Sequence, residues 1–180
     1  KPARTTPLSC LNLVNCLYEA GLPKEWVQVM ICKGSLAEKI ATDPRVSFLT
    51  FIGSGKVGWG LRSKLAPGVR CALEHGGAAP VIVEADADID DALPLLVKGG
   101  FYHAGQVCVS VQRVFVHEDI VEECSRKLAD IAGKLVVGDP VDEKTEVGPL
   151  ILEREVERIQ KWVEEAKAAG GKILMGGKKI

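Results

Sequence analysis

Apolar side chains near the start of the chain recur at a helical spacing. The run from Leu8 to Leu17 repeats every third residue, which predicts a helix with one apolar face. Thr6 is expected to cap this helix, with Pro7 at the first helical position, and Gly21 is expected to end it. Further helices are predicted at 35–43, where Ser35 and Glu38 form a capping-box pattern, from about Asp86 onward, and at 55–65, 120–132 and 152–169.

Short apolar runs between these segments predict β-strands. They lie at residues 26–31, 46–51, 69–74, 80–84, 112–117 and 172–175. Strands separated by helices indicate a parallel α/β architecture, in which strands are apolar throughout because helices cover both faces of the sheet. Gly76–Gly77 interrupts the alternation and is the expected boundary between two lobes.

The composition is that of an average globular chain and narrows the class of protein. The 180 residues are 47% hydrophobic and 26% charged, which excludes a disordered tail and a disulfide-stapled mini-protein. A net charge of -1 and 5% aromatic residues provide no platform for nucleic acid. No apolar run approaches the roughly 18 residues of a membrane span, so no membrane partner is expected. The chain opens at Lys1 without an initiator Met, and we expect an internal piece of a longer protein.

Six cysteines are present without a CxxC pair, and most of them lie in apolar stretches. This pattern favours buried thiols in a reducing, cytoplasmic compartment over a disulfide framework or a metal site. Cys108 differs from the others because it lies in a glycine-bounded loop before a predicted strand.

A glycine turn, Gly53–Ser54–Gly55, joins a predicted strand to a predicted helix. Backbone N–H groups in such a turn can approach a phosphate, and the positive end of the helix dipole favours negative charge there. The segment is not the GxGxxG fingerprint, since the flanking glycines are Gly53 and Gly58. A plain tight turn is the alternative interpretation.

Two further segments carry groups that are suited to catalysis. Glu74 ends a predicted strand just before Gly76–Gly77, where a carboxylate can act as a general base or can simply be solvated. Cys108 closes the segment Gly105–Gln106–Val107–Cys108 and can act as a nucleophile, although most cysteines are inert core residues. A Cys–His hydrolase would need His103 as the base, but no Asn or Asp stands out to orient that histidine.

In their order and spacing, these motifs resemble those of the aldehyde dehydrogenase superfamily along nearly the whole chain. Each motif is modest, but the ordered set is specific. The segments that carry the resemblance are Lys1-Pro2-Ala3 with Thr6-Pro7-Leu8, Glu19-Ala20-Gly21-Leu22-Pro23, Phe51-Ile52-Gly53-Ser54, Leu73-Glu74-His75-Gly76-Gly77, Gly105-Gln106-Val107-Cys108, Val137-Gly138-Asp139-Pro140 and Val147-Gly148-Pro149-Leu150.

The resemblance implies NAD(P)-dependent oxidation of a small aldehyde to a carboxylic acid. Cys108 would attack the aldehyde carbon to give a thiohemiacetal and then a thioester, while nearby backbone N–H groups stabilise the oxyanion. Glu74 would activate the water that releases the acid. The cofactor, NAD or NADP, would be held by Lys1, Arg4, Gly53, Ser54 and Gly58.

The resemblance also implies an α/β fold in two parts. Residues 1–75 would form the second half of a Rossmann-like NAD(P)-binding lobe, and residues 76–180 would begin an α/β catalytic lobe that carries the thiol nucleophile. The predicted helix at 55–65 lies in a region where relatives form dimers, so a homo-oligomer, either a dimer or a tetramer, is expected.

Three positions depart from the family pattern. Arg4 stands where many NAD-preferring relatives carry a glutamate that binds the ribose hydroxyls. A guanidinium there would accept a 2′-phosphate, which predicts acceptance of NADP, while a solvent-facing Arg4 is the alternative. His75 replaces the usual leucine and Ala78 replaces a common lysine, and neither side chain is needed for the implied mechanism.

Two other functions stay open. A CoA-acylating aldehyde dehydrogenase would pass the acyl group to a thiol, but such relatives commonly lack the carboxylate at the position of Glu74. A non-catalytic fragment that keeps the fold is the other, and the presence of both Cys108 and Glu74 argues against it.

Overall fold

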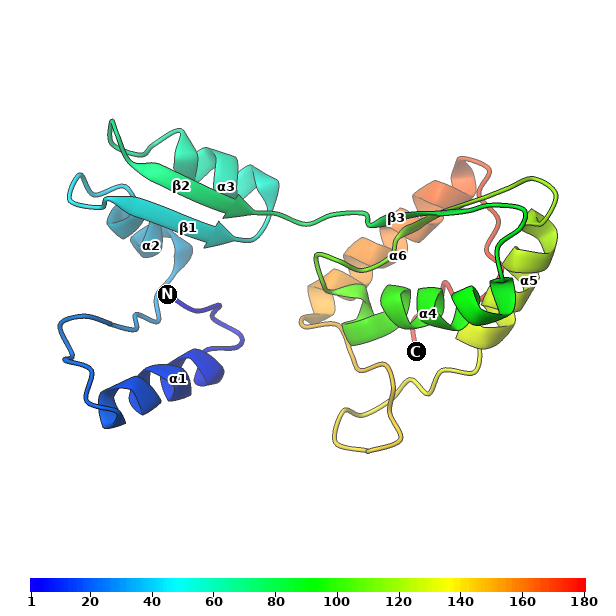
Figure 1. Ribbon diagram of the computed structural model, residues 1–180, viewed down its shortest axis with the longest axis horizontal. Helices are drawn as coiled ribbons and strands as arrows, with labels where there is room; N and C mark the ends of the chain where they lie inside the picture. The colour runs from blue at the N-terminus through cyan, green and yellow to red at the C-terminus, as the bar shows by residue number, and fades with distance from the viewer. The chain divides into compact units, whose positions relative to one another are not determined.

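The computed structural model describes residues 1–180 and divides them into two compact units (Figure 1). Unit 1 spans Lys1–His75 and unit 2 spans Gly76–Ile180. Each unit contains one pair of parallel strands together with helices, which confirms the predicted α/β class. None of the helices combines the length and the apolar character needed to cross a lipid bilayer.

Unit 1 is built around a parallel strand pair with a helix in the crossover. The strands β1 and β2 pair in register from Phe48↔Arg70 to Ile52↔Glu74, so both end at the same edge. The helix α3 connects them and lies beside β2 in Figure 1. The elements are α1 (Leu8–Glu19), α2 (Gly34–Ala41), β1 (Phe48–Ile52), α3 (Gly55–Arg62) and β2 (Arg70–Glu74).

Unit 2 repeats this plan and contains most of the buried side chains. The strands β3 and β4 pair in parallel from Pro80↔Arg113 to Val83↔Val116. The helices α4 and α5 pack together and bury Leu93. The elements are β3 (Pro80–Val83), α4 (Ile89–Phe101), a 3-10 segment (Tyr102–Gly105), β4 (Arg113–Val116), α5 (Val121–Ala132) and α6 (Glu153–Ala168).

The capping residues predicted for two helices are wrong, although both helices are present. The N-cap of α1 is Pro7 rather than Thr6, and no side chain accepts a hydrogen bond there. The N-cap of α2 is Lys33, which places Ser35 inside the first turn. Patterns of capping residues locate a helix start only to within one or two residues. Asp88 is a true cap of α4, because its carboxylate accepts hydrogen bonds from the N–H groups of Asp90 and Asp91.

Two predicted strands, at 26–31 and 172–175, are not formed. A strand needs a neighbour for its backbone hydrogen bonds, and each of the two sheets contains only two strands, none of them from these segments. The first segment instead follows α1, where the Tyr18 hydroxyl donates to the carbonyl of Val27. Its Trp26 side chain is 78% exposed.

The burial of strands and cysteines also differs from expectation. β1 and β2 alternate between exposed and half-buried residues, so one face of this strand pair is covered and the other is not, whereas both faces were expected to be covered. Among the six cysteines, Cys124 alone is buried, whereas Cys16 and Cys108 are exposed. The exposure of Cys108 agrees with its position in a loop.

Candidate functional site

The turn between β1 and α3 presents free backbone donors at a helix start. Ser54 is the N-cap of α3, and its side chain accepts no hydrogen bond from the helix. The N–H groups of Gly55 and Lys56, in the first turn, have no acceptor within the helix. Together with the helix dipole, these donors form a place where an anionic group is stabilised.

The backbone of Gly53 in this turn is held by the end of β2. Its N–H donates to the carbonyl of Glu74 at 3.0 Å. Its own carbonyl lies 3.4 Å from Nδ1 of His75. The Glu74 side chain is exposed at the strand end. The turn is therefore tied on both sides to the Glu74–His75 dipeptide, and the carboxylate stays free.

His75 fills the space beneath the turn, a role that its place in the sequence does not predict. Its ring lies against Gly58 and at 5.8 Å, centroid to centroid, from Trp59. A Cβ atom at Gly58 would collide with this ring and would lie 3.1 Å from the ring of Phe51. Nε2 of His75 is buried without a hydrogen-bond partner. The replacement of a leucine by a histidine so close to the turn was the available signal.

The loop that carries Cys108 leaves α4 through a left-handed backbone. Residues His103, Ala104 and Gly105 have φ values of 48°, 56° and 72°. Left-handed backbone is unfavourable for a residue with a Cβ atom by roughly 1–2 kcal/mol. Non-glycine residues in this conformation persist only where the surroundings hold them, and they cluster at functional sites.

Cys108 itself is exposed, and its backbone carbonyl lies against Gly77. A Cβ atom at Gly77 would come to 2.9 Å from the Cys108 carbonyl oxygen, so this close approach requires glycine. The N–H groups of Cys108 and Val109 donate to no backbone carbonyl. Free backbone N–H donors beside an accessible sulfur can stabilise the oxyanion that forms when the sulfur attacks a carbonyl group.

Backbone hydrogen bonds close the loop after Cys108. The N–H of Val111 donates to the carbonyl of Gly99 at 3.1 Å, and that of Gln112 donates to Ala78 at 3.1 Å. Ser110 between them is 2% exposed, and its hydroxyl has no partner. The loop is thus anchored to the end of α4 and to the start of β3.

The buried thiol contrasts with that of Cys108. Cys124, on α5, is 2% exposed. Burial raises the pKa of the Cys124 thiol above its ordinary value, and the neighbouring Glu123 raises it further. A raised pKa lowers the fraction of reactive thiolate, so Cys124 is an inert core residue and Cys108 is the better candidate nucleophile.

The remaining predicted site residues are exposed. Lys1 and Arg4 precede α1, and neither side chain forms an ion pair or hydrogen bond. Within unit 1, the fold brings Gly53, Ser54 and Gly58 to the end of β2, where Glu74 lies. Cys108 belongs to unit 2.

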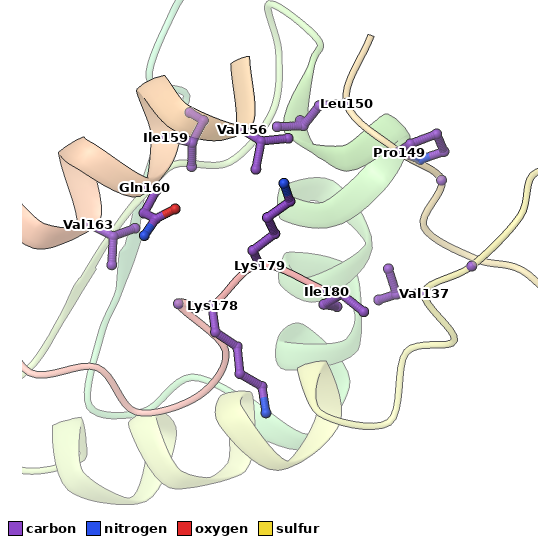
Figure 2. A pocket seen from close by; sticks show the side chains of 13 residues that line it. Val137, Pro149, Leu150, Val156, Ile159, Gln160, Val163, Lys178, Lys179 and Ile180 are labelled. Carbon is purple, nitrogen blue, oxygen red and sulfur yellow. The ribbon is translucent and has the colours of Figure 1, made fainter. Parts of the chain in front are cut away.

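A cavity of about 500 Å³ lies elsewhere in unit 2 (Figure 2). Apolar side chains of α6, including Val156, Ile159 and Val163, form one wall. The connector at Val137 and the C-terminal residue Ile180 border it as well. None of the predicted site residues lines this cavity, so it is separate from the candidate site.

Comparison with known proteins identifies what the chain is similar to. The model of the "Aldehyde dehydrogenase family" matches residues 1–180. A 3-sulfolactaldehyde dehydrogenase of Priestia megaterium is 44% identical over 181 residues, covering 99% of this chain and 38% of that protein. A lactaldehyde dehydrogenase of Methanocaldococcus jannaschii is 39% identical over 183 residues, covering 99% of this chain and 39% of that protein. The chain therefore spans well under half the length of these relatives.

Solved structures give the same result for the fold. Betaine aldehyde dehydrogenase from Staphylococcus aureus in complex with NAD+ superposes with a TM-score of 0.95 at 31% identity, covering 99% of this chain and 36% of that one. Glyceraldehyde-3-phosphate dehydrogenase from Methanocaldococcus jannaschii, complexed with NADP, gives a TM-score of 0.93 at 38% identity, covering 99% and 40%. The match of the family model over the whole length, with these relatives, confirms the resemblance: the chain belongs to the aldehyde dehydrogenase family.

Proposed function

We propose that this chain supplies the pyrophosphate turn, the nucleophile and the general base of an NAD(P)-dependent aldehyde dehydrogenase. Residues 1–75 would be part of the cofactor-binding domain and residues 76–180 part of the catalytic domain. The observation that carries the proposal is the exposed Cys108, which has free backbone donors beside it. The membership of the chain in the aldehyde dehydrogenase family and the names of its relatives support the same activity.

The residues of the turn fit a dinucleotide. The N–H groups at the start of α3, which have no acceptor within the helix, suit a pyrophosphate, and the exposed hydroxyl of Ser54 is available because it caps no helix donor. Gly58 keeps the helix close to the end of β2, as a larger residue would collide with His75. Lys1 would contact the adenosine ribose. Bound NAD(P)+ supplies the hydride acceptor that the oxidation requires.

Cys108 is the proposed nucleophile. Its thiolate forms a bond to the aldehyde carbon, and the carbonyl oxygen takes up the negative charge of a thiohemiacetal. The N–H groups of Cys108 and Val109, which have no backbone acceptor, are proposed to donate to that oxygen. Loss of hydride from the same carbon leaves a thioester on the sulfur.

Glu74 is the proposed base for the second half of the reaction. Its carboxylate takes a proton from water, the hydroxide attacks the thioester carbon, and the C–S bond breaks to release the carboxylic acid. The exposed side chain and the backbone bond from Gly53 to the Glu74 carbonyl leave the carboxylate free for this role. Retention of Glu74 favours water over CoA as the acyl acceptor.

Cys108→Ala tests the proposal in a full-length enzyme that carries this segment. We expect aldehyde oxidation to fall at least about a thousandfold, because the attacking atom is lost, while the dissociation constant for NAD(P)+ stays within about twofold. Initial rates and cofactor titration by fluorescence measure the two effects. Normal turnover by this variant would rule out the assignment, and Cys16→Ala, which removes another exposed thiol, is the control.

Arg4 is proposed to admit NADP. Its side chain is exposed and has no acidic partner, so it is free to pair with a 2′-phosphate. In Arg4→Glu we expect the ratio of NADP to NAD efficiency, each as kcat/KM, to fall at least about tenfold through repulsion of the phosphate. An unchanged ratio would show that Arg4 does not contact the cofactor, and Lys24→Glu controls for the change of overall charge.

We also propose that the protein is a homo-oligomer and that it works in a reducing, cytoplasmic compartment. Val57 and Trp59 on α3 are each at least half exposed, so this helix presents apolar surface to which a second copy of the protein is proposed to bind. Light scattering of a full-length enzyme that carries this segment measures its oligomeric state directly. The substrate would be a small aldehyde, the class on which the named relatives act.

A further inference from the structure

The Gln106 side chain joins two parts of unit 2 that are far apart in the sequence. Its Nε2 donates to the carbonyl of His103 at 3.1 Å. Its Oε1 accepts a hydrogen bond from the N–H of Ile151 at 2.9 Å. One planar amide thus bonds both to the left-handed turn before Cys108 and to a segment 45 residues further along the chain.

This amide is the only side chain in the nucleophile loop that forms such a connection. The other hydrogen bonds of residues 99–112 run between backbone groups, and the buried hydroxyl of Ser110 has no partner. The backbone bonds anchor the loop after Cys108, through Val111 and Gln112. Before Cys108, the N–H of Gln106 closes the turn onto the His103 carbonyl at 3.2 Å, but no backbone bond joins residues 103–107 to a distant part of the chain.

The far end of the connection is the segment that leads into α6. Ile151 directly follows Val147-Gly148-Pro149-Leu150 and stands two residues before α6. Val147 is itself buried and bridges to Val137, so the segment is anchored in the unit. A hydrogen bond to this segment therefore gives the loop a fixed point of attachment.

We propose that Gln106 is a positioning residue that fixes the loop before Cys108 by bonding it to the backbone at Ile151. This inference rests on the proposed role of Cys108 as the nucleophile. The amide holds the left-handed turn through its donor and the Ile151 backbone through its acceptor. It thereby sets the direction in which the chain enters Cys108, two residues later, without touching the substrate.

The chemistry of the two bonds explains why an amide stands here. Leucine has a similar size but provides neither donor nor acceptor. Glutamate keeps the acceptor for the Ile151 N–H but loses the donor for the His103 carbonyl. Comparison of Gln106→Leu with Gln106→Glu therefore separates the two bonds.

Amide hydrogen exchange at Ile151 tests the connection without reference to catalysis, again in a full-length enzyme that carries this segment. We expect exchange to rise about fivefold or more in Gln106→Leu, since a typical net hydrogen bond is lost, and to stay near the unmodified rate in Gln106→Glu. Gln28→Leu is the control, because Gln28 donates to the carbonyls of Lys24 and Glu25 in unit 1. Unchanged exchange in Gln106→Leu would overturn the proposal.

Steady-state kinetics test the consequence for the nucleophile. In Gln106→Leu we expect kcat to fall about fivefold to tenfold while KM for the dinucleotide stays within twofold, because Cys108 is displaced and the turn in unit 1 is untouched. Raised exchange with an unchanged kcat would also contradict the proposal. If Gln106→Leu does not fold, Gln106→Asn, which is too short to span both partners, replaces it. Activity that survives Cys108→Ala would refute the proposed function, while the exchange result would still report on the connection itself.

Discussion

The turn at Gly53–Gly58 and the loop at 102–110 hold their functional groups in different ways. In the turn, strand pairing fixes Gly53 through the Glu74 carbonyl, and His75 fills the space below. In the loop, the backbone is held by consecutive left-handed residues and by the two hydrogen bonds of the Gln106 amide. Regular secondary structure thus positions the backbone N–H groups that are proposed to bind phosphate. Strained backbone and the hydrogen bonds of Gln106 position the proposed nucleophile, Cys108.

The difference has a physical reason. Backbone N–H groups at a helix start point at a ligand by geometry alone, so a strand followed by a helix is sufficient for the turn. A nucleophile must be exposed to substrate and yet held in one position, so a loop that carries it needs contacts that fix its backbone. Local strain that the surroundings maintain is one solution.

The largest effect is expected from a substitution at the turn that removes the proposed general base and leaves the backbone in place. Glu74→Gln keeps the backbone carbonyl that holds Gly53 but loses the carboxylate. We expect kcat to fall about 10²–10⁴-fold, as is typical for loss of a general base. KM for the dinucleotide and a pre-steady-state burst of NAD(P)H should be preserved. Stopped-flow absorbance follows the burst, and its loss would mean that Glu74 acts before the thioester forms.

A smaller effect is expected from a substitution that disrupts the packing of the turn. Gly58→Ala places a methyl group against the His75 ring and at 3.1 Å from Phe51, so we expect a loss of about 1–3 kcal/mol in the free energy of unfolding. Denaturant unfolding of the same full-length enzyme measures it.

A matched control and a second substitution sharpen this test. Gly60→Ala, in the same helix, meets nothing within 4 Å and should be neutral or stabilising. His75→Ala removes the ring that the methyl group meets, so the effects of His75→Ala and Gly58→Ala should not add. Additive effects would mean that the ring and Gly58 are not in contact.

The smallest expected effect probes strain in the loop. Ala104→Gly relieves a left-handed alanine, and we expect a gain of about 0.5–1 kcal/mol in the free energy of unfolding. Ala92→Gly, within α4, should lose about the same amount, because glycine is unfavourable inside a helix. Unfolding curves of the two variants give the comparison, and equal losses in both would contradict the strain at Ala104.

Sequence patterns anticipated the turn better than the loop. The strand, glycine turn and helix around Gly53 follow from local spacing, and the parallel α/β class follows from the alternation of elements. The left-handed residues before Cys108 could not be predicted, because alanine and histidine rarely adopt that conformation. The bond from Gln106 to Ile151 joins residues whose proximity exists only in the fold.

The predicted strand at 26–31 did not form because strand formation depends on a partner strand. The segment at 26–31 has the residues of a strand but no strand to pair with, so its apolar side chains stay largely exposed. The role of His75 could not be predicted either, because it depends on the contact between the His75 ring and Gly58. Both properties depend on neighbours in space, which a local pattern does not contain.

The role of Cys108 as the nucleophile can be tested by identifying the sulfur atom that carries the acyl group during the reaction. Glu74→Gln enzyme is mixed with a short aliphatic aldehyde and NAD(P)+, quenched in acid and digested for mass spectrometry. We expect the peptide with Cys108 to gain the mass of the acyl group, while the peptide with the buried Cys124 does not. An unmodified Cys108 during the burst, or the acyl group on another cysteine, would contradict it.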